Sequence, residues 1–229
     1  MARFLGVLVA LVALVGCGGN VAINQAHIRF AHLVPDGGRL AYYFGDSLKF
    51  VNVEYPTITP YRAADSGAIT LNVGPFPGNT YLAQAFGNVT DAGRYTAVTI
   101  GYRSPQSGEP SLSMFVLQDE SIPPPTGESR LRVVQAAPNT NALDWYVTLT
   151  NVNLNDVEPD FTNIGLGEAS AYANFGVGTR RLRATLPGTK TVVYDTSIGL
   201  SGRQIYTLYL RLTTSGPVAI THSMVKDGG

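Results

Sequence analysis

The stretch RLRVVQAAPNTNALDWYV, residues 130–147, decides the fold, because an earlier stretch of the chain repeats its pattern. That earlier stretch is HIRFAHLVPDGGRLAYYF, residues 27–44. Each consists of an apolar run, a proline-containing turn and a second apolar run. Four positions are identical at a spacing of 103 residues: Arg29 and Arg132, Pro35 and Pro138, Leu40 and Leu143, and Tyr43 and Tyr146. The chain therefore contains one strand–turn–strand pattern twice.

Further matches extend the repeat over most of the chain. Tyr61, Gly67, Pro77-Gly78 and Tyr95-Thr96 recur in the same order as Tyr172, Gly178, Pro187-Gly188 and Tyr206-Thr207. The spacing drifts only as loop insertions would make it drift, and the largest insertion lies near residues 151–160. Such long copies are typical of duplicated domains, whereas solenoids need three or more short repeats. We therefore expect two domains in tandem.

Alternating polarity predicts β-strands in both copies. Leu182, Ala184 and Leu186 alternate with Arg181, Arg183 and Thr185, and the run 205–212 behaves likewise, as expected for half-buried strands. Turn sequences such as PDGG, residues 35–38, separate the runs. Short strands between such turns, without a convincing helical stretch, predict an all-β antiparallel sandwich.

Composition divides the chain at DESIPPPTGES, residues 119–129, where three consecutive prolines favour an extended connector. We expect the first β-sandwich at residues 26–118 and the second at residues 130–229. Residues 1–16 are expected to be a signal peptide, and residues 17–25 a lipidated N-terminus with a short tether.

The expectation of a signal peptide rests on the N-terminal segment. Arg3 precedes an apolar run, residues 4–15, which is about 18 Å long as a helix and too short for a hydrocarbon core of about 30 Å. LVGC, residues 14–17, resembles the bacterial lipoprotein box, in which the cysteine receives lipid. Cys17 is the only cysteine of the chain, so the sequence excludes an internal disulfide. A buried structural thiol is the alternative interpretation.

The lipoprotein resemblance implies contact with a membrane through the lipid anchor and a location in the cell envelope. Gly18 is not the aspartate that favours retention in the inner membrane in this class of protein. We therefore expect the outer membrane, with the protein facing the periplasm or the cell surface. The chain has 16 basic and 16 acidic residues, and such a neutral balance does not favour nucleic acid as a partner.

The two strand–turn–strand stretches also resemble the opening of the bacterial family called domain of unknown function 4397. Its members begin with an R-V-V-H-A-S-P-D-like strand and turn, followed by a D-V-Y-V-like strand, and many are exported lipoproteins. His32 and Asp36 fit this pattern in the first copy, whereas Gln135 and Asn139 replace them in the second. The resemblance implies two tandem immunoglobulin-like antiparallel β-sandwich domains and no catalytic residue. His32 is then interpreted as part of the turn.

No motif of the chain predicts a catalytic site, a cofactor or a metal. His27 and His32 are five residues apart in a predicted strand, so their side chains point to opposite faces. His222 stands alone near the last predicted strand. GLGEAS, residues 165–170, lacks the third glycine of a dinucleotide fingerprint and the helix that should follow it. A hydrolase would need a Ser/His/Asp set assembled without local support.

Three surface features suggest binding. The insertion at residues 151–160 offers Asn155, Asp156, Glu158 and Asp160 as oxygen ligands for calcium, although a solvated loop is the simpler interpretation. Arg181 and Arg183 share the outward face of a predicted strand and suggest an anionic partner. Tyr146, like Tyr43, is expected to point outward, whereas Trp145 is expected in the core.

The sequence therefore predicts a lipid-anchored cell-envelope protein that is not an enzyme and has a binding or structural role. An unknown envelope protein or a glycan is the expected partner, and the candidate binding surface consists of Arg181, Arg183 and Tyr146. A carbohydrate-binding module is the alternative function, and a hydrolase is the third.

Overall fold

The computed structural model describes residues 24–214 and 219–227. The strands of the N-terminal half are β1 (Gln25–His32), β2 (Leu40–Phe44), β3 (Ser47–Val53), β4 (Thr57–Ile58), β5 (Arg62–Asp65), β6 (Gly67–Pro75), β7 (Ala83–Val89), β8 (Arg94–Ile100) and β9 (Ser113–Asp119). Those of the C-terminal half are β10 (Glu128–Gln135), β11 (Leu143–Thr148), β12 (Phe161–Ile164), β13 (Ala173–Gly176), β14 (Gly178–Thr185), β15 (Val192–Leu200), β16 (Ile205–Leu212) and β17 (Ile220–Lys226). A 3-10 helix, η1 (Leu154–Asp156), is the one helical element within these ranges. The predicted all-β class is confirmed.

The strands form four sheets, two in each half. In the N-terminal half one sheet has the order β4-β1-β8-β9, with β5 also on β1, and the other has the order β3-β2-β6-β7. In the C-terminal half the orders are β13-β10-β16-β17 and β12-β11-β14-β15. The strand order of the two halves therefore corresponds.

Most neighbouring strands are antiparallel, as predicted, but β1 and β8 run parallel, and so do β10 and β16. The prediction of purely antiparallel sheets is wrong at these two places. A parallel pair needs a long crossover between its strands. Here the whole second sheet of each half supplies that crossover.

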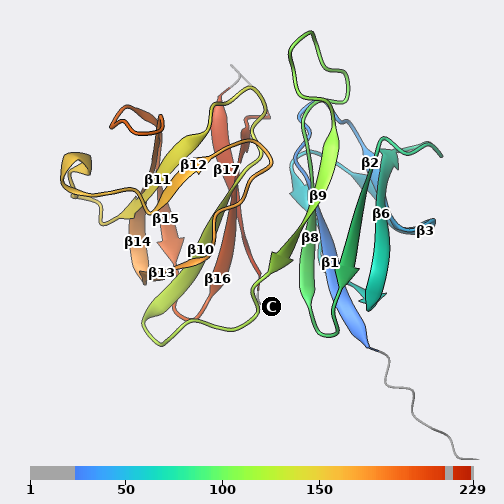
Figure 1. Cartoon of the computed structure of the whole chain (residues 1–229), viewed down its shortest axis with the longest axis horizontal. Helices are drawn as coiled ribbons and strands as arrows, with labels where there is room; N and C mark the ends of the chain where they lie inside the picture. The colour runs from blue at the N-terminus through green and yellow to red at the C-terminus, as the bar shows by residue number, and fades with distance from the viewer. Residues whose placement is uncertain (1–23, 215–218, 228–229) are drawn as a thin grey trace, which may run out of the picture.

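The four sheets stack as four layers, and three hydrophobic clusters lie between them. In the N-terminal half the cluster between the sheets includes Phe30, Tyr42 and Leu71, and in the C-terminal half it includes Trp145 and Leu182. A third cluster joins the halves, which lie side by side in Figure 1. Its buried members are Ala31, Leu33, Val98, Ile100, Val134, Ala136 and Tyr209.

The central strands of the two middle sheets, β1 with β8 and β10 with β16, are consequently buried on both faces over most of their length. In β16 every residue from Ile205 to Leu210 is buried, so the prediction of a half-buried strand is wrong there. Its leucines and Tyr206 pack within the C-terminal half, whereas Thr207 and Tyr209 face the N-terminal half. Alternation shows that a strand has two different faces, but it does not show whether the polar face meets water or another layer.

The predicted signal peptide, residues 1–16, and Cys17 lie outside the described residues. Within the described ranges no helix is long and apolar enough to cross a bilayer. The predicted connector, residues 119–129, overlaps two strands, because β9 ends at Asp119 and β10 begins at Glu128.

Candidate functional site

The densest group of charged side chains lies buried between the halves, and its first member is Arg29 on β1. The Arg29 guanidinium pairs with the carboxylate of Asp227, which follows β17 in the other half. Its Nη1 donates to the carbonyl oxygen of Lys226 at 3.0 Å, and its Nε donates to Oγ1 of Thr96 at 2.8 Å. The Arg29 and Asp227 side chains are at most 4% exposed.

Arg132 on β10 makes the corresponding set of contacts, with the aspartate and the carbonyl oxygen supplied by the N-terminal half. Its guanidinium pairs with the carboxylate of Asp119 at the end of β9. Nη1 donates to the carbonyl oxygen of Gln118 at 2.8 Å, and Nε donates to Oγ1 of Thr207 at 2.8 Å. Each half therefore supplies the arginine for the other half's aspartate.

Tyrosine hydroxyl groups also donate hydrogen bonds to both carboxylates. Tyr61 donates to Oδ2 of Asp119 at 2.6 Å, and Tyr172 donates to Oδ2 of Asp227 at 2.7 Å. Each phenol ring also lies 4.6 Å from the nearer arginine, Arg29 over Tyr61 and Arg132 over Tyr172. Burial is the main cause that raises the pKa of both phenols, so they stay protonated and keep donating.

Two guanidinium groups and two carboxylates make this buried cluster neutral. For Arg132, burial acts to lower the pKa, but neighbouring Tyr172 and Asp119 outweigh it and raise the pKa, so the charge is kept. Charges that are paired and hydrogen-bonded in this way fix one arrangement of the halves. We name Arg29, Arg132, Asp119, Asp227, Tyr61, Tyr172, Thr96 and Thr207 the interface cluster.

Most members of the interface cluster are repeat matches in the sequence, but the sequence alone indicates no role for them. The arginine, tyrosine and threonine pairs all recur between the copies. Asp119 and Asp227 were missed, although each stands at or directly after the last strand of its half. That shared position was the available signal.

His32 is buried at the end of β1 and serves the turn that follows. Its Nε2 lies 3.0 Å from the carbonyl oxygen of Gly38, and its Nδ1 accepts the Val34 N–H at 3.4 Å. In the C-terminal half Gln135 donates through Nε2 to the Asn141 carbonyl oxygen at 3.4 Å. Its Oε1 accepts the Ala137 N–H at 3.0 Å. Because the amide makes the same two contacts, the interpretation of His32 as part of the turn is supported by the geometry.

This equivalence leads to a prediction for His32→Gln. At pH 8 the free energy of unfolding should stay within about 1 kcal/mol of the original value, because glutamine offers the same donor and acceptor. Burial lowers the pKa of His32 against the opposing hydrogen bond to Gly38, so the folded state holds the ring neutral. The stability that the neutral His32 ring contributes is present above the unfolded-state pKa of about 6.5 and is lost as the pH falls.

Urea unfolding of both proteins at pH 8 and pH 5 checks this prediction. The His32→Gln protein should lose less stability than the original protein between the two values. Gln135→His is the reciprocal variant and should lose more. An equal loss in all three proteins would contradict the assignment of His32 as a buried neutral ring.

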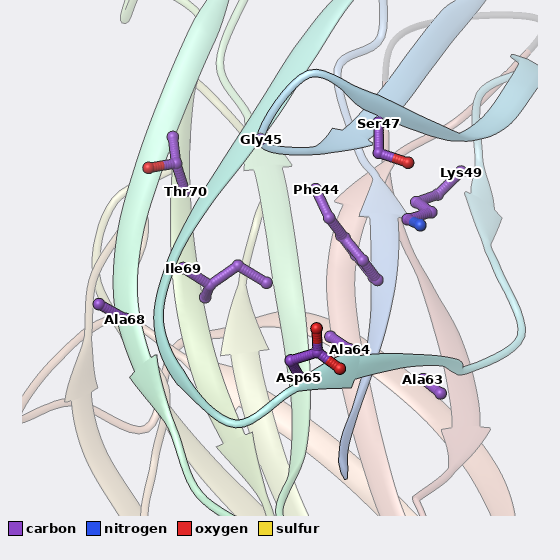
Figure 2. A pocket seen from close by; sticks show the side chains of 10 residues that line it. All are labelled: Phe44, Gly45, Ser47, Lys49, Ala63, Ala64, Asp65, Ala68, Ile69 and Thr70. Carbon is purple, nitrogen blue, oxygen red and sulfur yellow. The ribbon is translucent and has the colours of Figure 1, made fainter. Parts of the chain in front are cut away.

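A cavity of about 470 Å³ opens at the end of the N-terminal sandwich, between the turn after β2 and strands β5 and β6. In Figure 2 Phe44 and Ile69 point into the space between Lys49 and Asp65, whereas Thr70 points away on the other side of β6. An apolar floor with a few polar groups is typical of a small-ligand site. The lining residues are Phe44, Gly45, Ser47, Lys49, Ala63, Ala64, Asp65, Ala68, Ile69 and Thr70.

The predicted exposure of Arg183 is wrong, and Arg181 is already paired. Arg183 is 4% exposed, because its Nη2 donates to Oγ1 of Thr148 and to the carbonyl oxygen of Val152. Both contacts come from β11 and the inserted loop, which covers this face of β14. Arg181 donates twice to Asp195, at 3.0 and 2.6 Å. These hydrogen bonds are the main cause that lowers the pKa of Asp195.

The predicted exposure of Tyr146 is also wrong, since its side chain is 1% exposed. The ammonium group of Lys190 lies 4.8 Å from its ring centroid and donates to the Val157 carbonyl oxygen in the insertion at 2.6 Å. Tyr146 does point away from Trp145, which is fully buried in the core as predicted. The insertion covers the outward face that the sequence assigned to solvent.

The acidic side chains of the insertion do not converge. Asp160 uses Oδ2 to accept the Val147 N–H at 2.7 Å, and Asn153, not Asn155, caps η1. Among residues 24–214 and 219–227, no three His, Cys, Asp or Glu side chains are grouped as a metal would require. His222 instead lies 2.6 Å from the Tyr194 hydroxyl through Nδ1.

Comparison with known sequences gives a family match. The family described as "Domain of unknown function (DUF4397)" matches residues 26–146, from β1 through most of β11. No curated protein sequence matches the chain.

Three solved structures are similar to the chain at low identity. One is described as "Alpha-glucan binding by a streptococcal virulence factor", with 10% identity, a TM-score of 0.26, and coverage of 81% of this chain and 93% of the other. The second is a product complex of a multi-modular glycogen-degrading pneumococcal virulence factor, SpuA, with 9% identity, a TM-score of 0.26, and coverage of 87% and 24%. The third is a leucine-rich repeat protein from Bacteroides thetaiotaomicron, with 10% identity, a TM-score of 0.21, and coverage of 80% and 26%. The chain thus spans about a quarter of the second and third structures, and similarity at this level does not identify a site.

Proposed function

The chain belongs to the family of the domain of unknown function DUF4397, and from this premise we propose that it is a lipid-anchored, non-catalytic binding protein of the bacterial cell envelope. Cys17 is the proposed site of the lipid, and the outer membrane is the proposed location. Two copies of one immunoglobulin-like sandwich are proposed to form the part that carries the binding surfaces.

The observation that carries this proposal is the reciprocal pairing in the interface cluster. Arg29 with Asp227, and Arg132 with Asp119, are buried across the boundary between the halves. The apolar side chains of the third cluster are buried in the same boundary. Two copies held in this way act as one rigid body, which presents its outer sheets at a fixed distance and angle. Such a frame suits a protein that holds a partner close to a membrane.

The same cluster argues against a hydrolase. A hydrolase of the Ser/His/Asp type needs a histidine that can reach both a nucleophile and a substrate. His32 is fully buried and contacts a carbonyl oxygen and a backbone N–H of its own turn. The paired carboxylates of Asp119 and Asp227 are saturated by arginine and hydroxyl donors. These groups therefore act in folding.

A glycan is the second candidate for the partner, because large apolar side chains are exposed on the outer sheet of the N-terminal half. Phe86 is 74% exposed and Tyr81 is 39% exposed. Rings in such positions can stack on the apolar faces of sugars.

Replacing the lipid attachment site tests the anchor. Cys17→Ser should abolish incorporation of labelled palmitate, because serine lacks the thiol that receives the lipid. It should also leave the signal peptide uncut and move the protein out of the detergent-soluble membrane fraction. Labelling of cells followed by immunoprecipitation measures the first effect. Asn20→Ser is the control for a nearby change to serine and should label normally; undiminished labelling of Cys17→Ser would refute the anchor.

A further inference from the structure

The outward face of the sheet β3-β2-β6-β7 carries one row of side chains across three strands. Tyr43 pairs in register with Asn72, and Asn72 pairs with Gln84. Thr70 and Phe86 pair in the next row on the same face. Leu71 and Val73 alternate with these residues along β6 and point into the core. We name Tyr43, Leu48, Thr70, Asn72, Gln84 and Phe86 the outer face of the N-terminal half.

This outer face exposes rings next to polar groups that carry no charge. Phe86 is 74% exposed and Leu48 is 50% exposed, which leaves two large apolar side chains in solvent. Tyr81 covers one end of the row, with its ring 5.4 Å from that of Tyr43 and its hydroxyl donating to Oδ1 of Asp46 at 2.9 Å. The six side chains that define the face are all uncharged.

Asn72, in the middle of the row, is buried and has a side-chain oxygen without a hydrogen-bond donor. The residue is 2% exposed, and its Nδ2 donates to the Gly45 carbonyl oxygen at 2.7 Å. Its Oδ1 is buried and has no hydrogen-bond partner. A buried acceptor without a donor costs about 1–3 kcal/mol. A ligand hydroxyl that enters as the partly exposed Tyr81 side chain turns aside would supply the missing donor.

The equivalent positions of the C-terminal half are different in chemistry and in access. There Tyr146 pairs with Arg183, and Arg183 pairs with Asp195, in place of Tyr43, Asn72 and Gln84. Arg181 neutralises Asp195, and Arg183 donates to the Val152 carbonyl oxygen of the inserted loop that covers it. The corresponding surface is therefore charged, paired and covered. Within the described residues, the sheet of the N-terminal half therefore has an open, uncharged outer face, and the equivalent sheet of the C-terminal half does not.

From this contrast we infer that the outer face of the N-terminal half binds a neutral saccharide, with Phe86 as the ring on which a sugar stacks. Gln84, Thr70 and Asn72 supply its hydrogen bonds. The inference rests on the proposed binding function and names the ligand class and the surface.

The chemistry of the face matches that of a neutral sugar. A sugar ring has an apolar face of C–H groups and a rim of hydroxyls that both donate and accept hydrogen bonds. Phe86 matches the first, and the side-chain amides of Gln84 and Asn72, which also donate and accept, match the second. An acidic polymer would lose hydrating water on binding, and an uncharged face offers no cation to offset that cost.

The cavity at the end of the sandwich lies on the other side of β6 from the outer face. Thr70 and Gly45 line the cavity, and Thr70 also belongs to the outer face. Figure 2 shows the Thr70 side chain on the opposite side of β6 from Phe44 and Ile69. Thr70 with Phe86 and Asn72 with Gln84 form two neighbouring rows, so a chain of several sugar units can run along the outer face. We expect oligosaccharides to bind better than monosaccharides.

An array of neutral and acidic oligosaccharides, probed with the purified full-length protein in detergent, tests the inference. We expect binding to neutral oligosaccharides and about a tenfold or greater loss for Phe86→Ala, which removes the stacking ring. Val193→Ala is the matched control, because Val193 is also an exposed apolar residue on the edge strand of the equivalent sheet, at 39%. That control should bind as the original protein does, and thermal unfolding should show that both variants are folded.

Several results would overturn the saccharide site. They are binding to acidic oligosaccharides alone, no binding to any member of the array, or binding that survives Phe86→Ala and Gln84→Ala together. Sedimentation with isolated cell-envelope material separates this failure from failure of the proposed function. If the original protein and Phe86→Ala sediment equally with the envelope, binding remains and the saccharide site is wrong. If the original protein does not sediment with the envelope at all, the proposed binding function is wrong as well.

Discussion

Asp119→Ala is expected to lower the free energy of unfolding by about 3–5 kcal/mol, because it leaves the Arg132 guanidinium buried without its carboxylate. The Asp119 and Arg132 side chains are at most 4% exposed, so water cannot replace the lost partner. Thr96 and Tyr61 also lose their acceptor. Urea unfolding followed by the fluorescence of Trp145, the only tryptophan of the chain, measures the change.

Two controls separate the buried pair from charge loss in general. Arg39 and Glu54 form an exposed ion pair, with side chains 60% and 62% exposed, so Glu54→Ala should cost no more than about 1 kcal/mol. Joint replacement of Asp119 by leucine and Arg132 by methionine should cost less than Asp119→Ala, since no charge is then left alone. If Asp119→Ala costs no more than Glu54→Ala, the interface cluster does not hold the halves together.

Trp145→Ala is expected to cost about 3–5 kcal/mol through the cavity that it leaves. Trp145 is fully buried between the two sheets of the C-terminal half, with its ring 6.3 Å from that of Tyr194. The strands around it are tied into two sheets, so the gap can close only in part. Circular dichroism during urea unfolding measures the effect, because the variant has no tryptophan fluorescence.

Phe86→Ala provides the comparison for a large ring outside the core. Since Phe86 is 74% exposed, its loss should change the free energy of unfolding by no more than about 0.5 kcal/mol. A cost for Trp145→Ala as small as that for Phe86→Ala would contradict the packing of Trp145. The same pair of variants thus separates a ring that stabilises the fold from a ring available to a ligand.

The sequence anticipated the strands because local chemistry controls them. The turn at residues 35–38 and the alternation along β14 depend on neighbouring residues only. The exchange of His32 for Gln135 also indicated a structural position, and both side chains make equivalent contacts. Burial of Trp145 followed from its place among apolar residues on one face of β11.

The candidate surface was less predictable, because exposure depends on what covers a strand. Arg183 and Tyr146 do point away from the core, as alternation requires, yet the inserted loop lies over them. No local rule predicts where a loop of irregular sequence will rest. The outer face of the N-terminal half has no such insertion, and for that reason Leu48, Gln84 and Phe86 remain exposed.

By itself, the sequence determined an all-β chain in which one pattern occurs twice, since alternation and turn residues act over a few positions. The tertiary structure alone decided that Arg29 and Arg132 each pair with an aspartate of the other half. It also decided that the central strands of the middle sheets are buried between the halves. Arg29 and Asp227 lie 198 residues apart, and no periodicity relates them. Their pairing follows from the removal of water between two layers, which makes an unpaired charge costly and a matched pair stable.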